Sequence, residues 1–417
     1  MSRDADADLP AGPEMPGALP EALRAELIAF RRDLHMHPEL GNQEFRTTAA
    51  LKARLEKAGL QPRVLAVGTG LMCDIGTEDS ARSAIGGGRA GVRPMLALRA
   101  DIDGLPIPDT KSVPYRSTVP DRAHACGHDV HTTVALGAGL VLAELAKSGR
   151  LPRPVRLIFQ PAEEVLPGGA LDTIDSGVLD GVGRLIGLHC DPKVEVGRIG
   201  LRPGPITSAC DRLEVSLDGA GGHTARPHLT TDLVAAAAKV AVEVPALVAR
   251  RIDARSGLAV TWGRIESGHA CNVIPQHAEL SGTVRCLDLA AWRTAPDLVH
   301  AAIDEIATLH RAKSQINYIR GVPPVVNEVV STELLRDAMA VRRGQASVED
   351  TEQSLGGEDF SWYLERVPGA MARLGVRRVG DTTRRDLHCG DFDVDEGAIQ
   401  VGVELFTAAA LIDGHRP

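Results

Sequence analysis

Residues 124–131, with the sequence HACGHDVH, gather side chains that bind metals and transfer protons. The segment holds one thiol (Cys126), three imidazoles (His124, His128 and His131) and one carboxylate (Asp129). Thiolate and imidazole ligands suit a borderline ion such as Zn²⁺. The alternative is structural, with a buried thiol and histidines at the start of a helix. The segment alone therefore leaves a metal site and a structural role open.

Two adjacent carboxylates, Glu163 and Glu164, follow an apolar run at residues 155–159. Successive residues at a strand end point in different directions, so one carboxylate could bind a metal while its neighbour faces the reacting water. A solvated turn is the ordinary interpretation of such a pair, but the proline before it and the two glycines after it favour a site. His189 and His388 are further candidate ligands, although either one alone is more often a structural histidine.

Short apolar strands that alternate with helices must position these residues. Strands are predicted near residues 95–98, 155–159 and 184–188, with helices near 47–58 and 131–147. This alternation indicates an α/β domain with a largely parallel sheet. In such sheets ligands bind at the carboxyl ends of the strands. Polar residues follow all three strands, so we expect them to meet at one edge of the sheet.

The pattern changes at about residue 209. The order strand–helix–strand–strand–helix–strand is that of a small ferredoxin-like domain. Its elements are predicted at residues 213–217, 232–250, 258–265, 277–285, 289–309 and 315–319. After about residue 323 the chain resembles its first half again. The sequence therefore predicts a disordered lead at 1–20, a larger α/β domain built from 21–208 and 323–417, and a smaller domain inserted at 209–322.

Composition narrows the classes of function. The 417 residues include 46 Lys and Arg against 55 Asp and Glu, and the net charge of −9 disfavours a surface for nucleic acid. Seven thinly spread cysteines are no disulfide framework, and they favour a reducing, cytoplasmic compartment. The first 20 residues lack the apolar core of a signal peptide. The apolar runs at 132–146 and 233–249 are too short or too interrupted to span a membrane, so no membrane partner is expected.

A stretch rich in Gly, Ala, Ser and Arg at residues 77–93 indicates a flexible surface excursion. It contains the sequence GGGRAG at 86–91, a literal G-x-G-x-x-G. The dinucleotide-binding fingerprint needs a strand directly before it and a helix that opens on its last glycine. Here a polar stretch precedes the glycines, and a proline and a strand follow. We therefore expect a loop and no nucleotide site.

Several motifs, taken in order along the chain, resemble those of the M20 amidohydrolases. The resemblance is to the branch that contains hippurate, N-acyl-amino-acid and auxin-conjugate hydrolases, and it runs from about residue 25 to about residue 405. It implies a zinc-peptidase-like catalytic domain with an inserted ferredoxin-like lid and dimerisation domain, which agrees with the layout above. The motifs are RRDLH at 31–35, PEL at 38–40, LRADID at 98–103, HACGHDVH at 124–131, FQPAEE at 159–164, GGH at 221–223, NVIP at 272–275, GTVR at 282–285 and GEDF at 357–360.

The resemblance implies a set of five metal ligands: Cys126, His128, Glu164, His189 and His388. Five ligands are more than one catalytic zinc usually takes, so two divalent ions are expected. One thiolate, one carboxylate and three imidazoles suit Zn²⁺, with Mn²⁺, Ni²⁺ and Co²⁺ as alternatives. We expect Cys126 to bridge the two ions.

The resemblance also implies catalytic residues. Glu163 resembles the family's general base, which takes a proton from the attacking water and returns it to the leaving amine. Asp101 resembles the acid that orients a metal ligand, and the role of its neighbour Asp103 is open. His223 resembles the lid histidine that assists the oxyanion, which in some relatives comes from the partner subunit. A role confined to the structure of the lid is the alternative for His223.

Substrate contacts are implied for two further residues. Asn272 and Arg285 resemble substrate-binding positions, and the forked guanidinium of Arg285 suits a carboxylate. Pairing within the lid is the alternative for both. Supporting roles are expected for His131, His228 and Asp359.

The sequence thus predicts a metal-dependent amidohydrolase that cleaves N-acyl amino acids or related conjugates, with Glu163 as general base. A dipeptidase or carboxypeptidase-like enzyme is the first alternative, because the same site hydrolyses peptide bonds. A non-catalytic metal-binding protein on the same fold is the second, and it is disfavoured because neither the base nor any ligand is missing. The expected partners are a small-molecule substrate and further copies of the chain, joined as a homodimer or a higher oligomer through the lid. The preferred acyl group and amino acid cannot be predicted from the sequence.

Overall fold

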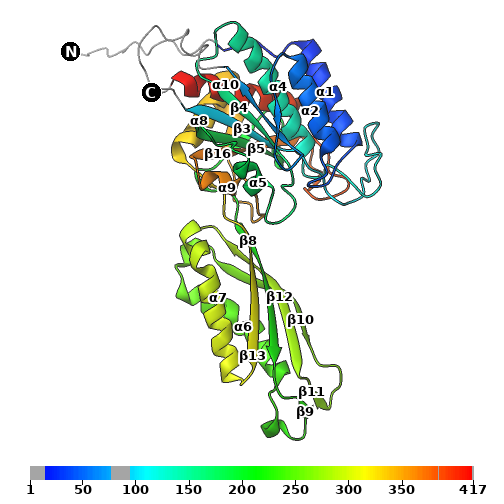
Figure 1. Cartoon of the computed structure of the whole chain (residues 1–417), viewed down its shortest axis with the longest axis vertical. Coiled ribbons are helices and arrows are strands. Elements are labelled where there is room, and N and C mark those ends of the chain that lie inside the picture. Colours follow the sequence, from blue (N-terminus) through cyan, green and yellow to red (C-terminus); the bar gives the residue numbers. More distant parts are fainter. Residues whose placement is uncertain (1–14, 77–93, 384, 416–417) are drawn as a thin grey trace, which may run out of the picture.

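The structure is a computed structural model, and it describes residues 15–76, 94–383 and 385–415. The chain forms two bodies that meet where β8 (Ala209–Asp218) leaves the larger one (Figure 1). Most of the predicted lead at 1–20 lies outside the described residues, as do the predicted excursion at 77–93 and the glycine-rich sequence within it.

An eight-stranded mixed sheet forms the centre of the larger body. Its strands are β1 (Arg63–Val64), β2 (Leu71–Ile75), β3 (Met95–Asp101), β4 (Val155–Gln160), β5 (Val182–Glu195), β6 (Ile199–Leu201), β15 (Val348–Asp350) and β16 (Gly369–Arg377), in the order β1-β2-β4-β3-β5-β16-β6-β15. The central strands β4, β3, β5 and β16 are parallel. β2 is antiparallel to β1 and β4, and β6 is antiparallel to β16. The mixed α/β class is confirmed, and the predicted parallel pairing holds for the centre of the sheet.

Helices cover both faces of this sheet. They are α1 (Glu21–Met36), α2 (Phe45–Lys57), α4 (His128–Lys147), α5 (Ala170–Asp175), α8 (Val329–Arg343), α9 (Ser361–Leu364) and α10 (Gly397–His415). α1, α2, α4 and α10 lie on one side of the sheet, and α5 and α9 lie on the other (Figure 1). By length and composition, α4 and the part of α10 from Gly397 to Gly414 could each cross a membrane, but 83% of each apolar window is buried inside the protein. Both helices contribute to the main hydrophobic core of the larger body.

The smaller body, residues 209–322, has a sheet of its own. Besides β8 it contains β10 (Ala259–Ser267), β12 (His277–Cys286) and β13 (Lys313–Val322), all antiparallel, in the order β10-β12-β8-β13. Helices α6 (Leu233–Arg251) and α7 (Leu289–Leu309) share a hydrophobic core with the sheet. Each helix follows an aspartate that caps it: Asp232 accepts from the Ala235 N–H at 3.0 Å, and Asp288 from the Ala291 N–H at 2.7 Å.

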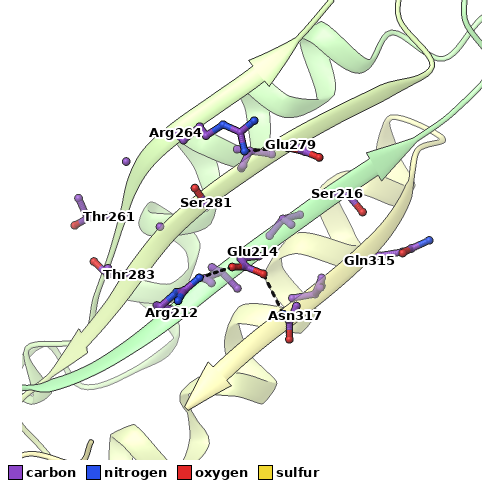
Figure 2. Close-up of a pocket in the computed structure, with 16 residues that line it drawn as sticks. Arg212, Glu214, Ser216, Thr261, Arg264, Glu279, Ser281, Thr283, Gln315 and Asn317 are labelled. Atoms are coloured by element: carbon purple, nitrogen blue, oxygen red, sulfur yellow. Dashed lines mark hydrogen bonds and ion pairs between the residues drawn. The ribbon is translucent and has the colours of Figure 1, made fainter. Parts of the chain in front are cut away.

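The other face of this sheet is open and polar. A hollow of about 900 Å³ lies over it, and side chains from all four strands line it, among them Arg212, Thr261, Glu279 and Asn317 (Figure 2). Like charges do not gather there, because Arg212 pairs with Glu214 on the same strand and Arg264 pairs with Glu279 across strands. The face thus carries balanced charge.

Short elements complete the fold. β9 (Gly222–His223) pairs with β11 (Val273–Ile274), and Figure 1 shows this pair at the end of the smaller body that points away from the large sheet. β7 (Gly204–Pro205) pairs with β14 (Val326–Asn327). The described residues also form the 3₁₀ turns η1 (Pro227–Leu229), η2 (Ala254–Ser256) and η3 (Gln345–Ser347).

Candidate metal and catalytic site

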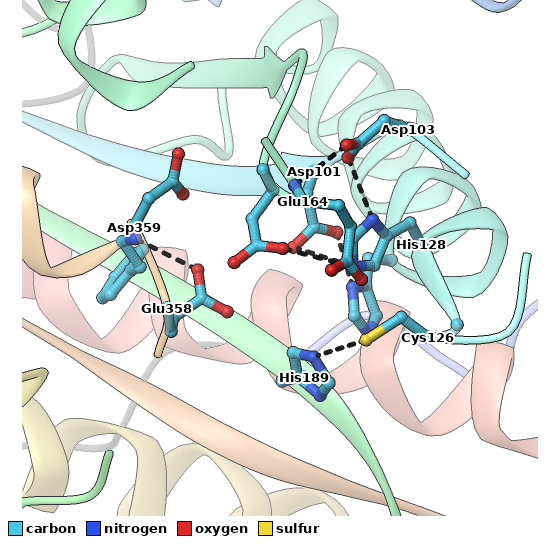
Figure 3. A network of polar contacts seen from close by, with 12 residues as sticks. Asp101, Asp103, Cys126, His128, Glu164, His189, Glu358 and Asp359 are labelled. Carbon is cyan, nitrogen blue, oxygen red and sulfur yellow. Dashed lines mark hydrogen bonds and ion pairs between the residues drawn. The ribbon is translucent and has the colours of Figure 1, made fainter. Parts of the chain in front are cut away.

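Four of the predicted metal-binding residues, Cys126, His128, Glu164 and His189, lie close together in the larger body (Figure 3). Glu164 follows the end of β4, whereas His189 lies within β5, which continues past the predicted strand end to Glu195. Cys126 and His128 stand on either side of Gly127, the residue that caps α4, and His128 is the first residue of the helix. Gly127 has φ +88°, and a Cβ atom on it would lie 2.7 Å from the sulfur of Cys190. Only glycine fits this turn, so the backbone itself fixes how the thiol and the imidazole enter the site.

The five predicted ligands fall into two overlapping groups of potential donor atoms. Cys126, His128 and His189 form one group, and Cys126, Glu164 and His388 form the other. Within each group the donor atoms all lie within 4.8 Å of one another. The sulfur of Cys126 is 3.4 Å from Nε2 of His189, and Nε2 of His388 is 3.2 Å from Oε1 of Glu164. Cys126 belongs to both groups, which is the position that a bridging ligand needs.

Hydrogen bonds orient two of the histidines with one ring nitrogen toward the site. Nδ1 of His189 donates to the carbonyl of Cys190 at 2.8 Å, so its Nε2 carries the lone pair. Nδ1 of His128 donates to Oδ1 of Asp103 at 3.1 Å. Nε2 of His128 is buried and has no hydrogen-bond partner among the described residues. A buried polar atom without a hydrogen-bond partner is costly, and coordination of a cation by Nε2 would satisfy it.

Asp103 also fixes the carboxylate ligand. Its Oδ2 accepts a hydrogen bond from the backbone N–H of Glu164 at 3.0 Å, while its Oδ1 holds His128. One carboxylate therefore positions residues that come from β4 and from α4. The sequence left the role of Asp103 open, and the structure supplies these contacts.

Asp101 has other partners. It accepts hydrogen bonds from Nδ1 of His131 at 2.6 Å and from Arg99 at 2.7 Å, and it lies 3.8 Å from Nε2 of His128. His131 in turn accepts from the backbone N–H of Cys190 at 2.8 Å. Asp101 thus supports the site through His131, and the hydrogen bond to the predicted ligand His128 is made by Asp103.

The electrostatics of the site favour bound positive charge. Burial alone would lower the pKa of His128, but the nearby carboxylates of Asp101, Asp103 and Glu164 outweigh burial and raise this pKa to about 10. Burial, reinforced by Glu164 and Glu163, raises the pKa of the Cys126 thiol. A divalent cation would reverse the effect on the thiol, because it stabilises the thiolate directly.

Glu163 lies beside a buried acidic pair. Its carboxylate oxygen is within 4.8 Å of those of Glu358 and Asp359, and its Oε2 is 3.9 Å from Nε2 of His128. Burial, together with Glu358 and Glu164, raises the pKa of the Glu163 carboxyl. A raised pKa suits a group that must accept a proton and then release it. The predicted supporting residue Asp359 is therefore at the site, with a pKa that burial raises to about 8 despite Arg99.

Arg99 is the buried cation that this acidic cluster shares. Its guanidinium donates to Asp101 at 2.7 Å, to Asp359 at 2.8 Å and to the side chain of Gln160 at 2.9 Å, and it lies 3.2 Å from Glu358. Reasoning from the sequence did not single out Arg99 or Glu358. Both stand in motifs that carried the resemblance, at 98–103 and 357–360, and that position was the only signal available.

Four other predicted residues lie in the smaller body, outside this cluster. His223 is in β9 and Asn272 directly precedes β11, and the carbonyl of Asn272 accepts from the Thr224 N–H at 3.2 Å. The β9–β11 pair is at the distal end of the smaller body (Figure 1). Arg285 is near the other end, where it donates to the carbonyl of Leu355 at 2.6 Å. His228, in η1, is exposed.

Comparisons with known proteins identify the family of the chain. Residues 97–412 match the model of peptidase family M20/M25/M40. The N-acetyl-L-cysteine deacetylase of Bacillus subtilis (strain 168) is 38% identical over 90% of this chain and 85% of its own length. A Rhodococcus jostii (strain RHA1) protein named "Putative glutamate--cysteine ligase 2-3" is 45% identical over 93% of this chain, which spans only 47% of that protein.

A solved structure shows the same fold. The crystal structure of a Bacillus subtilis protein, called a dinuclear metal binding peptidase from the M20 family, superposes with a TM-score of 0.80. It is 32% identical in sequence, and the match covers 95% of this chain and 99% of that one. The chain therefore belongs to peptidase family M20/M25/M40.

Proposed function

We propose that the protein is a metal-dependent amidohydrolase that converts an N-acyl amino acid or a related conjugate into a carboxylate and an amine. The observation that carries the proposal is the convergence of five ligand-type side chains beside Glu163. The deacetylase relative supports the substrate class, because removing an acetyl group from N-acetylcysteine is hydrolysis of an N-acyl amino acid.

Two divalent ions are the proposed cofactors, held by Cys126, His128, Glu164, His189 and His388. The two overlapping donor groups and the unpartnered Nε2 of His128 fit a pair of cations, as does the similarity to a dinuclear peptidase. Such ions acidify water and polarise an amide carbonyl. Zn²⁺ suits a site with a thiolate and three imidazoles best, and Mn²⁺, Ni²⁺ and Co²⁺ also bind such donors.

Glu163 carries the proton transfers in the proposed reaction. It takes a proton from the attacking water as the new C–O bond forms, and it passes a proton to the departing nitrogen as the C–N bond breaks. Glu358 and Asp359 exclude bulk solvent from one side of Glu163, since both are buried. Asp103 holds Glu164 and His128 in place during these proton transfers. The position of these two ligands relative to Glu163 is therefore fixed.

His223, Asn272 and Arg285 are the proposed substrate contacts. His223 and Asn272 stand at the distal end of the smaller body, so they reach a site only if this body closes or if a partner subunit supplies them. We therefore propose a homodimer or a higher oligomer formed through the smaller body, which would act as a lid. A cytoplasmic location also stays a prediction; all seven cysteines are free in the structure.

The test is activity against a panel of N-acetyl, N-benzoyl and aminobenzoyl amino acids and dipeptides, with each metal added in turn. Glu163→Gln should abolish turnover and leave the bound metal near its normal amount. Glu144→Gln, the same change on an exposed helix surface, is the matched control and should have normal activity. Full activity of the Glu163→Gln enzyme would refute the mechanism, and turnover of dipeptides alone would favour a peptidase.

A further inference from the structure

Residues 355–365, called here the bridging segment, connect the two bodies. Near its start, the carbonyl of Leu355 accepts a hydrogen bond from Arg285 of β12 at 2.6 Å. Gly357 packs against the base of the smaller body: a Cβ atom on it would lie 3.0 Å from Cβ of Cys210 in β8 and 2.9 Å from Cγ2 of Val322 in β13. A larger residue at 357 would push against both strands.

The end of the bridging segment packs against helix α7 of the smaller body. The indole rings of Trp362 and Trp292 meet edge to face, with centroids 5.9 Å apart and an angle of 71° between their planes. Next to them Arg293 forms an ion pair with Glu365. An aromatic pair of this kind contributes about 0.5–1.5 kcal/mol beyond its buried area. The smaller body therefore contacts the bridging segment at both ends of that segment.

The same segment braces the loop that carries Glu163, residues 161–169. Oδ2 of Asp359 accepts from the Ala170 N–H at 3.0 Å, just after this loop. Gly168 has φ +95°, and a Cβ atom on it would lie 2.5 Å from Cβ of Asp359. Trp362 donates from Nε1 to the carbonyl of Pro167 at 3.3 Å. Three contacts thus hold one side of the loop.

The middle of the bridging segment is buried and held by ion pairs. Glu358 and Asp359 are 3% and 1% exposed, and both contact the buried guanidinium of Arg99. Asp359 has a further partner in the side chain of Gln160, at 2.7 Å, at the end of β4. Because these groups are paired inside the protein, the segment cannot shift at one end without disturbing the other.

We infer that Trp362 is a positioning residue for Glu163, and that the bridging segment makes the place of the Glu163 loop depend on the contact with the smaller body. The inference rests on the proposed function for its kinetic consequence. When the smaller body rotates about its base, Trp292 pushes or releases Trp362, and the loop at 161–169 moves with it. The carboxylate of Glu163 is then placed correctly for catalysis in only one position of the smaller body.

The kinetic test uses the full-length, metal-loaded enzyme. Trp362→Ala should lower kcat about tenfold or more, because misplacement of a catalytic group by an ångström costs up to about a hundredfold. KM and bound metal should change less than threefold. Trp362→Phe keeps a ring against Trp292 and should recover kcat to within about threefold of the parent. Trp262→Ala is the matched control, since Trp262 is in β10 and has no part in the bridging segment.

A second measurement does not depend on turnover. Hydrogen exchange of peptides from residues 161–170 should become faster in Trp362→Ala and stay unchanged in Trp262→Ala. Arg293→Glu should speed exchange in the same peptides, and adding Glu365→Arg should restore protection by reversing the ion pair. Unchanged exchange at 161–170 in Trp362→Ala, or a kcat within twofold of the parent, would overturn the inference. If the parent enzyme cleaves no N-acyl amino acid, the proposed function fails, and the exchange data still decide whether the segment braces the loop.

Discussion

Replacing the Asp103 carboxylate with an amide should weaken metal binding, because this carboxylate orients two of the proposed ligands. Asp103→Asn keeps the size and shape of the side chain. The carboxylate accepts two hydrogen bonds, one from Nδ1 of His128 at 3.1 Å and one from the N–H of Glu164 at 3.0 Å. An amide has one accepting oxygen, so one of these donors would face an NH₂ group instead.

The expected loss of metal affinity follows from the hydrogen bond that the substitution removes. A hydrogen bond to a charged group contributes about 1.5–3 kcal/mol, and Asp103→Asn should lose one such bond. Loss of a group that orients a metal ligand typically costs 10–100-fold in metal affinity. At about 1.4 kcal/mol per tenfold, the two figures agree, and we expect the dissociation constant for Zn²⁺ to rise between about 10-fold and 100-fold.

The assay is titration of the metal-free protein with Zn²⁺ in the presence of a competing chelator. Asp218→Asn is the matched control, because Asp218 also accepts from a histidine, His277 at 2.8 Å, on the exposed surface of the smaller body. That variant should bind metal normally. Circular dichroism and a melting curve establish that the Asp103→Asn protein is folded. A folded variant with unchanged affinity would show that His128 and Glu164 do not need Asp103, and the assignment of these contacts to metal binding would be wrong.

Three further outcomes follow from the same geometry. Cys126→Ser should lower metal occupancy, measured by elemental analysis, because a hydroxyl does not replace a thiolate ligand; normal stoichiometry would remove Cys126 from the ligands. Chelation of the parent protein should lower its melting temperature, since a ligand that binds only the folded state stabilises it, and this loss should be absent in a Cys126→Ser, His189→Ala double variant. Burial raises the pKa of Glu44 from its ordinary 4.5 to about 7. Ionisation of Glu44 therefore opposes folding, and its contribution to stability is present below about pH 4.5 and is lost as the pH rises through 7. Glu44→Gln keeps the acceptor for the Asn42 and Ala162 N–H groups, so urea unfolding at pH 5 and pH 8 should show a smaller loss of stability in the variant than in the parent.

Local chemistry explains why much of the fold could be predicted. The helix at 289–309 has the predicted bounds because Asp288 caps its start and an apolar stripe buries Trp292 and Val299 against the sheet. The convergence of the candidate ligands was predictable for a similar reason. Parallel strands end at one edge of a sheet, so Asp103, which follows β3, and Glu164, which follows β4, meet there although they are far apart in sequence. His189 reaches the same place from within β5, which is longer than the sequence predicts.

The hydrogen-bond partners of the side chains at that edge could not be predicted from the sequence. Asp101 and Asp103 are two residues apart, so in a continuous strand both side chains would point to the same face. The sequence therefore does not indicate which of the two contacts His128. β3 ends at Asp101, and the chain turns there, so Asp101 reaches His131 whereas Asp103 reaches His128. Arg99 posed a harder problem, because its partner Asp359 is 260 residues away and a buried pair leaves no local periodicity.

The placement of the smaller body in the chain explains how one site can be built from such distant segments. The chain leaves the large body at the start of β8 and returns at the end of β13, and these strands are paired, with Cys210 opposite Val322. Both ends of the inserted segment therefore lie at one place, and an insertion of this kind need not separate the parts of the larger body. Gly357, which comes after α8 and β15 in the chain, packs against that same pair of residues. Glu358 and Asp359, which follow Gly357 in the chain and lie beside Glu163, therefore stand next to the point where the smaller body is attached.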